Sequence, residues 1–138
     1  MNFSQISDPT LHKPHVNLAV GKRILIVDDQ EAVLLFLQDR LEQLGFRVAA
    51  VSNGEEAIQR LQEHSFQGVL LDLEMPIMDG LAMLNQLRKQ SNDVPVIVMS
   101  ADPTRTTMIK AIEAGARDYL TKPISSVILK YKCLRLFP

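Results

Sequence analysis

The sequence predicts an α/β fold, a doubly wound (βα)5 three-layer sandwich built around a five-stranded parallel sheet. Short apolar runs recur at regular intervals along the chain, and three of them are nearly continuous in Val, Ile and Leu. Strands of that composition are buried on both faces, which is typical of a central parallel sheet. The segments between the runs have the period of an amphipathic helix. Right-handed crossovers then place helices on both faces of the sheet.

The apolar runs give the expected strands, which are residues 23–27, 46–51, 68–72, 94–98 and 116–120. A chain of 138 residues is long enough for one domain, and it buries about two-thirds of its unfolded surface, which is sufficient for an ordinary core. We therefore assign residues 21–138 to one domain. Residues 1–20 lie outside the repeat and are expected to form a flexible N-terminal extension.

The first three helices are marked by their apolar faces and by their ends. Between Glu31 and Leu44, apolar residues recur on one face, and Gly45 is placed to end the helix. The second helix follows the capping signal Ser52-Asn53-Gly54-Glu55. The third begins at the Asp79-Gly80 turn.

The last two helices are expected near the C-terminus. The fourth should begin with Asp102 as its N-cap and Pro103 at its first helical position, and it should end at Gly115. Apolar residues at helical spacing between Ile124 and Tyr131 mark the fifth.

Composition narrows the class of protein. Lys and Arg total 15 against 16 Asp and Glu, so a formal net charge of -1 gives no indication of direct nucleic-acid binding. The single cysteine excludes an internal disulfide and is compatible with a reducing compartment. No apolar run reaches the ~18 residues of a transmembrane helix, and the first twenty residues do not resemble a signal peptide. A cytoplasmic protein without membrane association is expected.

Polar side chains follow four of the five expected strands at their carboxyl ends, where ligands bind in open α/β sheets. These residues are Asp28, Asp29, Asp72, Ser100 and Lys122. Alone, each aspartate is more simply a cap or turn residue, Ser100 a turn hydroxyl and Lys122 a solvated charge. Together, three carboxylates in one crevice repel each other unless a cation joins them. Oxygen ligands favour Mg²⁺, which retains waters and binds phosphate oxygens.

Such a site supports phosphoryl transfer. An aspartate beside Mg²⁺ can attack phosphorus to give an acyl phosphate, while a lysine neutralises the phosphoryl oxygens and a hydroxyl binds one of them. The sequence contains no P-loop, no dinucleotide fingerprint, no nucleophile elbow and no zinc-ligand spacing.

Four segments in order and in register resemble the receiver domains of two-component response regulators, the chemotaxis receiver among them. The segments are Asp28-Asp29, Asp72-Leu73-Glu74-Met75-Pro76-Ile77-Met78-Asp79-Gly80, Ser100-Ala101 and Gly115-Ala116-Arg117-Asp118-Tyr119-Leu120-Thr121-Lys122-Pro123. The resemblance covers nearly all of the chain from Lys22 to the last helix. It implies the flavodoxin-like strand order 2-1-3-4-5.

The resemblance also implies roles for individual residues. Asp72 would accept a phosphoryl group from a histidine kinase or a histidine phosphotransfer protein. Mg²⁺ would be held by Asp29 directly, by Asp28 through water, by Asp72 and by the backbone carbonyl of Glu74. Lys122 would pair with Asp72 and then with its phosphoryl group, and the bond between Lys122 and Pro123 would be cis.

A conformational switch is implied as well. Ser100 would be the switch hydroxyl and Tyr119 the aromatic ring that changes rotamer, which would alter the surface of the fourth helix, fifth strand and fifth helix. Glu74 and Asp102 depart from the commonest residues of the family, and we expect them to tune the lifetime of the acyl phosphate. The alternative is that Glu74 points to solvent.

The chain is thus expected to be a signalling phosphoacceptor that assists its own phosphorylation and dephosphorylation, and not an enzyme. Its output would lie in a downstream effector protein or a missing output domain, and phosphorylation-dependent homodimerisation stays open. Two alternatives remain. An aspartyl-phosphate phosphatase or phosphotransferase is disfavoured because Asp28 and Asp29 are adjacent, whereas those enzymes separate the two aspartates by one residue. A phosphorylation-independent interaction module would have lost Asp72, Lys122 or the acidic pair.

Overall fold

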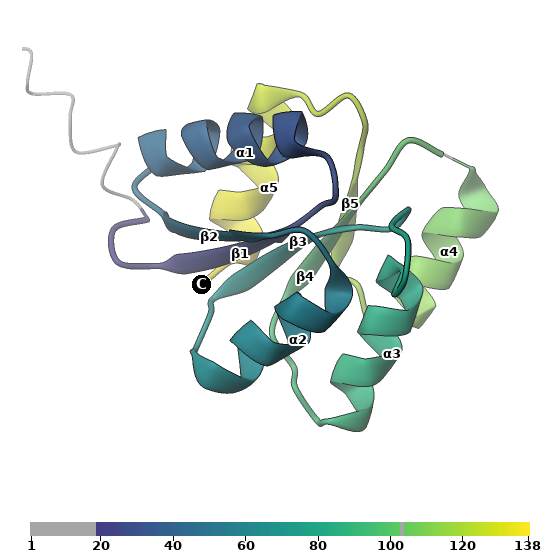
Figure 1. Cartoon of the computed structure of the whole chain (residues 1–138). Coiled ribbons are helices and arrows are strands. Elements are labelled where there is room, and N and C mark those ends of the chain that lie inside the picture. Colours follow the sequence, from purple (N-terminus) through teal and green to yellow (C-terminus); the bar gives the residue numbers. More distant parts are fainter. Residues whose placement is uncertain (1–18, 103) are drawn as a thin grey trace, which may run out of the picture.

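The computed structural model describes residues 19–102 and 104–138, which form one parallel sheet covered by helices (Figure 1). The strands are β1 (Arg23–Val27), β2 (Arg47–Val51), β3 (Gly68–Asp72), β4 (Val96–Ser100) and β5 (Asp118–Thr121). Every pairing is parallel, and the strand order is β2-β1-β3-β4-β5. The predicted fold class and strand order are therefore confirmed.

Within the described residues, five helices alternate with the strands, and they are distributed over the two faces of the sheet (Figure 1). They are α1 (Glu31–Gln43), α2 (Gly54–Glu63), α3 (Gly80–Lys89), α4 (Arg105–Glu113) and α5 (Ser126–Leu136). Alternate residues of each central strand face opposite sides. Leu25 and Val27 of β1 therefore pack in the cluster that contains the buried residues of α2, α3 and α4, whereas Ile24 and Ile26 pack with those of α1 and α5.

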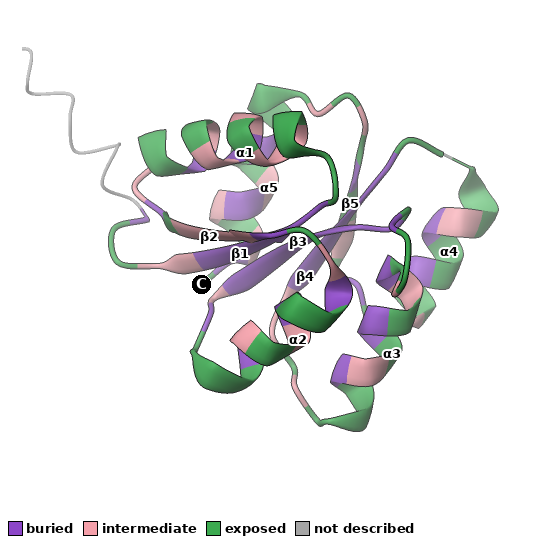
Figure 2. Ribbon diagram, viewed as in Figure 1, coloured by how far each residue is buried: buried purple, intermediate pink, exposed green. Residues whose placement is uncertain are grey.

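The central strands are the most buried part of the molecule, as Figure 2 shows. All five residues of β3 and all five of β4 are buried, which agrees with the prediction of strands that are apolar on both faces. The polar exceptions in this core are Asp28, Asp72 and Ser100. All three lie at the carboxyl end of a strand, so the polar groups that the core accommodates are concentrated at one edge of the sheet.

Several predicted boundaries are corrected. β4 begins at Val96 and not at Val94, because Pro95 has no N–H to donate to the ladder. β5 begins at Asp118 and not at Ala116, because the N–H of Ala116 still donates to the carbonyl of Ala111 at the end of α4. β2 begins one residue later than predicted, at Arg47.

The start of α4 is also corrected. Its N-cap is Thr104, whose side chain accepts from the N–H of Thr107, and not Asp102. The predicted role of Pro103 falls on a residue outside the described part of the chain. The predicted capping signal of α2 is confirmed, since Asn53 caps that helix. The helix α3 begins at the predicted Asp79-Gly80 turn, where Asp79 is its N-cap.

Most of the predicted N-terminal extension, residues 1–18, lies outside the described residues. Ala19 is fully buried in the cluster between the sheet, α1 and α5. No helix in the described ranges combines the length and the apolar character needed to cross a membrane.

Candidate functional site

The parallel register brings the predicted site residues to one edge of the sheet. Leu71 lies opposite Val27, so Asp72 at the end of β3 is adjacent to Asp28, which directly follows β1. Ser100 ends β4 and lies opposite Thr121, the residue before Lys122. Residues far apart in sequence are therefore gathered by topology alone.

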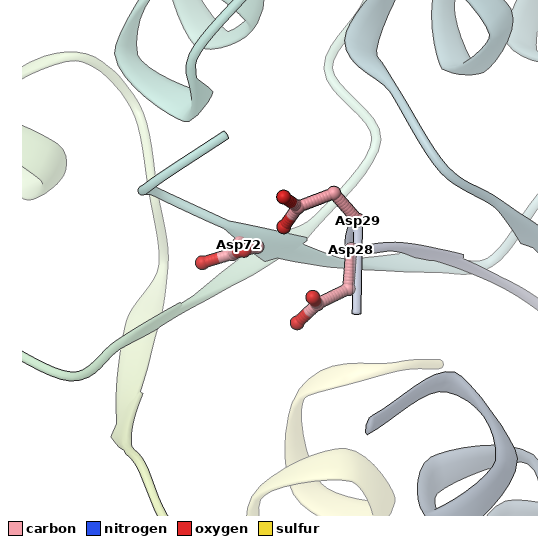
Figure 3. A group of neighbouring side chains, drawn as sticks. All are labelled: Asp28, Asp29 and Asp72. Carbon is pink, nitrogen blue, oxygen red and sulfur yellow. The ribbon is translucent and has the colours of Figure 1, made fainter. Parts of the chain in front are cut away.

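Three carboxylates form the centre of this edge. One carboxylate oxygen from each of Asp28, Asp29 and Asp72 can be chosen so that all three lie within 4.8 Å of one another. Figure 3 shows the three side chains projecting from the ends of β1 and β3 toward the same side. Asp28 and Asp72 are buried, whereas Asp29 is exposed.

Lys122 supplies the positive charge of the site. Its Nζ lies 2.8 Å from Asp28 Oδ2, 3.3 Å from Asp72 Oδ1 and 3.4 Å from Gln30 Oε1. Burial alone would lower the pKa of Lys122, but the hydrogen bond to Asp28 and the charges of both carboxylates together raise it. The ammonium group is thus held protonated between two acids. The peptide bond between Lys122 and Pro123 is cis, as the resemblance implied.

Asp72 experiences opposing influences. Burial and the neighbouring charge of Asp28 raise its pKa from 3.8 to about 7, although Lys122 and the N–H of Glu74 act in the other direction. The N–H of Glu74 donates to Asp72 Oδ1 at 3.1 Å. Positive charge beside the carboxylates would counter this rise, because it favours their ionised forms.

These donors fit a hard divalent cation. Carboxylate oxygens are the ligands that Mg²⁺ prefers, together with water. Asp28 Oδ1 accepts the N–H of Gln30 at 2.9 Å, as in a simple turn. Its other oxygen, Oδ2, is buried and lies 2.8 Å from the Lys122 ammonium group, with which it forms an ion pair. Asp28 therefore stabilises a turn with one carboxylate oxygen and offers the other to a positive charge.

Ser100 and Glu74 contact each other directly. The Ser100 hydroxyl lies 2.6 Å from Glu74 Oε2, and the N–H of Ala101 donates to Glu74 Oε1 at 3.1 Å. Ser100 Oγ also lies 3.0 Å from the carbonyl oxygen of Asp102 and accepts the Asp102 N–H at 2.9 Å. The alternative that the Glu74 carboxylate simply points to solvent is therefore wrong, although the residue as a whole is exposed.

The Asp102 carboxylate faces α4. It accepts the N–H of Thr104 at 3.0 Å and the hydroxyl of Thr107 at 3.1 Å. The first of these hydrogen bonds is the main reason why the pKa of Asp102 is lowered. Asp102 thus connects Ser100 to the first turn of α4. Its backbone bonds to the Ser100 hydroxyl, and its side chain bonds to Thr104 and Thr107.

Tyr119 lies away from the acidic cluster, on the outer surface of β5, and is 39% exposed. Lys132 of α5 contacts both its ring and its carbonyl oxygen. The sequence pattern does not indicate a role for Lys132 or for the N–H of Ala101. The pairing of Lys132 with Tyr119 has no signal in the local sequence pattern, whereas Ala101 could have been found because it directly follows Ser100.

The fold and this edge of acids, hydroxyl and lysine define a signal-receiving module built on a parallel sheet. The family model of the response regulator receiver domain matches residues 24–132. The chain belongs to this family and is a receiver domain of the two-component response regulator type.

Particular relatives agree. Over 114 residues the chain is 39% identical to the transcriptional regulatory protein PrrA of Mycobacterium tuberculosis, a match that covers 81% of this chain and 49% of that protein. Over 106 residues it is 36% identical to the alkaline phosphatase synthesis transcriptional regulatory protein PhoP of Bacillus subtilis, covering 77% and 44%. The chain thus spans about half the length of these relatives.

Solved structures show the same fold. The receiver domain of the Francisella response regulator 1452 has a TM-score of 0.81 and 30% identity, with 85% of this chain and 97% of that chain covered. The receiver domain of the Pseudomonas aeruginosa sensor histidine kinase PA1611, described with a magnesium ion coordinated in its active site cleft, has a TM-score of 0.78 and 28% identity, with 86% and 98% covered.

Proposed function

We propose that this receiver accepts a phosphoryl group on Asp72 from a phosphohistidine of a histidine kinase or a histidine phosphotransfer protein. The observation that carries the proposal is the position of Asp72, which is buried at the end of β3 beside Lys122 and two further carboxylates. A carboxylate oxygen of Asp72 attacks phosphorus, the P–N bond breaks, and its electron pair returns to the imidazole of the donor.

We propose that Mg²⁺ is the cofactor, held by Asp29, by Asp72, by the backbone carbonyl of Glu74, and by Asp28 through water. When bound, it neutralises charge on the phosphoryl oxygens. The chain's own groups act around it. Lys122 stabilises negative charge on the transferred group, and the Ser100 hydroxyl and the Ala101 N–H donate to its oxygens.

Phosphorylation adds about 1.5–2 negative charges and three acceptor oxygens at this edge. We propose that Ser100 and Tyr119 respond and change the surface formed by α4, β5 and α5. The route is supported by the Asp102 contacts, which join the Ser100 loop to the start of α4. In this proposal Glu74 and Asp102 tune the lifetime of the acyl phosphate, and the site assists both phosphorylation and dephosphorylation.

The output lies in a downstream effector protein or in an output domain that these residues do not include. Relatives about twice as long that are named as transcriptional regulators support the second form. We propose a cytoplasmic location, no direct nucleic-acid or membrane binding by this domain, and homodimerisation upon phosphorylation. The large apolar residues exposed on α4, β5 and α5 support the last point, and these are Ile109, Ile112, Tyr119, Val127, Ile128 and Tyr131.

The test is phosphorylation by acetyl phosphate with Mg²⁺, followed by intact mass. Wild type should gain one phosphoryl group, and Asp72→Asn should gain none. Asp39→Asn, which removes an exposed acid from α1, is the matched control and should behave as wild type. A gain that persists in Asp72→Asn would overturn the assignment of the acceptor. No gain in any variant would instead favour a phosphorylation-independent module, and turnover of many phosphodonors would favour the phosphatase.

A further inference from the structure

The Glu74 carboxylate accepts hydrogen bonds from two donors at once. Its Oε2 lies 2.6 Å from the Ser100 hydroxyl, and its Oε1 lies 3.1 Å from the Ala101 nitrogen. A hydroxyl and the next backbone N–H, both directed at one anion, form an oxyanion-binding pair. In this structure the anion is a side chain of the same chain.

The reach of Glu74 follows from the fold of its loop. Its N–H donates to Asp72 Oδ1, which fixes the backbone two residues beyond the end of β3. β4 is the neighbouring strand, and Asp72 lies opposite Met99, so the end of β4 is close. The side chain of Glu74 therefore extends from the loop after β3 to the loop after β4.

Neither donor can serve two anions at once. A hydroxyl has one proton and a backbone amide has one, so each donates fully to a single strong acceptor. For Ser100 that acceptor is Glu74, since the 2.6 Å contact to a carboxylate is shorter than the 3.0 Å contact to the Asp102 carbonyl. A phosphoryl group on Asp72 that recruits either donor must first displace the Glu74 carboxylate.

We infer that Glu74 is an internal substitute for the phosphoryl oxygens, which holds Ser100 and Ala101 in the unphosphorylated protein and competes with the phosphoryl group for both donors. This inference rests on the proposed phosphorylation of Asp72. It goes beyond the lifetime of the acyl phosphate. It also states which acceptor the two donors bind in the unphosphorylated protein, and that the phosphoryl group must compete for them after phosphorylation. Loss of the carboxylate should therefore raise the affinity of the site for any phosphoryl-like anion.

The first measurement uses the protein without a phosphoryl mimic. Amide hydrogen exchange and the chemical shift of the Ala101 amide are recorded by NMR for wild type, Glu74→Ala and Glu74→Gln. Because a hydrogen bond to a charged group is lost, exchange at Ala101 should become roughly tenfold faster in Glu74→Ala. Glu74→Gln, whose neutral oxygen can still accept from one donor, should show a smaller change.

The second measurement is a titration with beryllofluoride, a phosphoryl mimic, in the presence of Mg²⁺. Affinity should rise roughly tenfold in Glu74→Ala and about threefold in Glu74→Gln. The control is Glu55→Gln, which removes the same charge at an exposed position of α2 and should bind as wild type. Urea denaturation of each variant checks that it is folded and measures the stability lost with the hydrogen bonds of Glu74.

The outcomes separate this inference from the proposed function. If wild type binds beryllofluoride and Glu74→Ala binds it equally tightly with an unchanged Ala101 amide, the competition is overturned and the phosphoacceptor stands. If no variant responds to beryllofluoride, the phosphoacceptor is overturned and the competition with it. Faster exchange at Ala101 together with tighter binding supports the inference.

Discussion

Lys132 clamps Tyr119 in an outward position. Its Nζ lies 4.7 Å from the centre of the Tyr119 ring, donates to the Tyr119 carbonyl oxygen at 2.6 Å, and pairs with Asp118 Oδ1 at 2.9 Å. One ammonium group therefore contacts the ring, the backbone and the neighbouring side chain of β5. The aromatic residue that we propose as part of the switch is therefore held by a residue of α5.

Removing this clamp should favour the switched state. In Lys132→Met the ring loses a cation–π contact, and we expect the affinity for beryllofluoride to rise about two- to fivefold because outward Tyr119 is stabilised less. Tyr119 ring signals in NMR and a beryllofluoride titration measure this. Lys130→Met removes the same charge from an exposed site of the same helix and should have no such effect. Identical behaviour of the two variants would contradict the clamp.

Gly80 and Gly54 occupy the same position in two helices but have different neighbours. A Cβ at Gly80 would lie 2.7 Å from the carbonyl oxygen of Asp72 and 2.8 Å from the Cα of Leu73, which are backbone atoms of the site loop. A Cβ at Gly54 would meet the Met78 side chain, with Sδ at 2.9 Å. Backbone beside a buried strand end cannot retreat, whereas a methionine side chain can.

We therefore expect Gly80→Ala to lower the free energy of unfolding by about 1–3 kcal/mol and to reduce phosphorylation, because the backbone of Asp72 must shift. Gly54→Ala should change stability by less than about 1 kcal/mol, since the gain in helix propensity offsets the displacement of Met78. Urea denaturation and acetyl phosphate labelling of both variants provide the measurement. Equal losses in the two variants would show that close backbone approach is not the reason for glycine at position 80.

The central elements of the site were predictable because they follow from topology. Once the strands are parallel, their carboxyl ends must lie at the same edge of the sheet. Asp28, Asp72, Ser100 and Lys122 could therefore be placed at that edge from their positions after apolar runs. The cap of α2 at Asn53 and the start of α3 at the Asp79-Gly80 turn were predictable for the same local reason. These signals depend on strand ends and helix starts, which the order of residues specifies directly.

Contacts between loops and across elements were not predictable. The position of the Glu74 carboxylate depends on the path of the loop after β3 and on the distance to β4, and no periodicity encodes either. At α4 two capping patterns overlapped, and Thr104 replaced Asp102 as N-cap because Asp102 itself accepts the Thr104 N–H. The Lys132 contacts require the packing of α5 against β5, which a local sequence pattern does not specify.

Ile77 has a left-handed backbone conformation in the loop between Asp72 and Asp79. Its φ is 68°, and the residue is 83% exposed. For an L residue this conformation costs roughly 1–2 kcal/mol, and for a β-branched residue it is a genuine outlier. Little packing is lost when so exposed a side chain is removed.

Residues that tolerate this conformation should therefore stabilise the protein. We expect Ile77→Asn and Ile77→Gly to raise the free energy of unfolding by about 0.5–1 kcal/mol, the gain for glycine being reduced by its larger entropy in the unfolded chain. Ile77→Val retains the β-branch and should leave stability nearly unchanged. Urea denaturation of the three variants measures this, and a loss of stability in Ile77→Asn would contradict the strain.

Cys133 makes stability depend on pH in alkaline solution. The thiol is fully buried in the cluster beneath α1 and α5, and burial raises its pKa from 9.0 to about 12. Between these two values the unfolded chain releases the thiol proton while the folded protein retains it. The unfolded state then binds fewer protons, so the free energy of unfolding falls as the pH rises through this window.

Between pH 8 and pH 10 this thiol should lower the free energy of unfolding by about 1.4 kcal/mol, relative to a variant without it. Urea denaturation of wild type and Cys133→Ala at both pH values isolates the effect, because other titrating groups are common to both proteins. Cys133→Ala should be less stable at pH 8, since it leaves a cavity, and the gap should narrow at pH 10. Parallel pH profiles for the two proteins would contradict a raised thiol pKa, as would rapid reaction of Cys133 with a thiol reagent in the folded protein at pH 8.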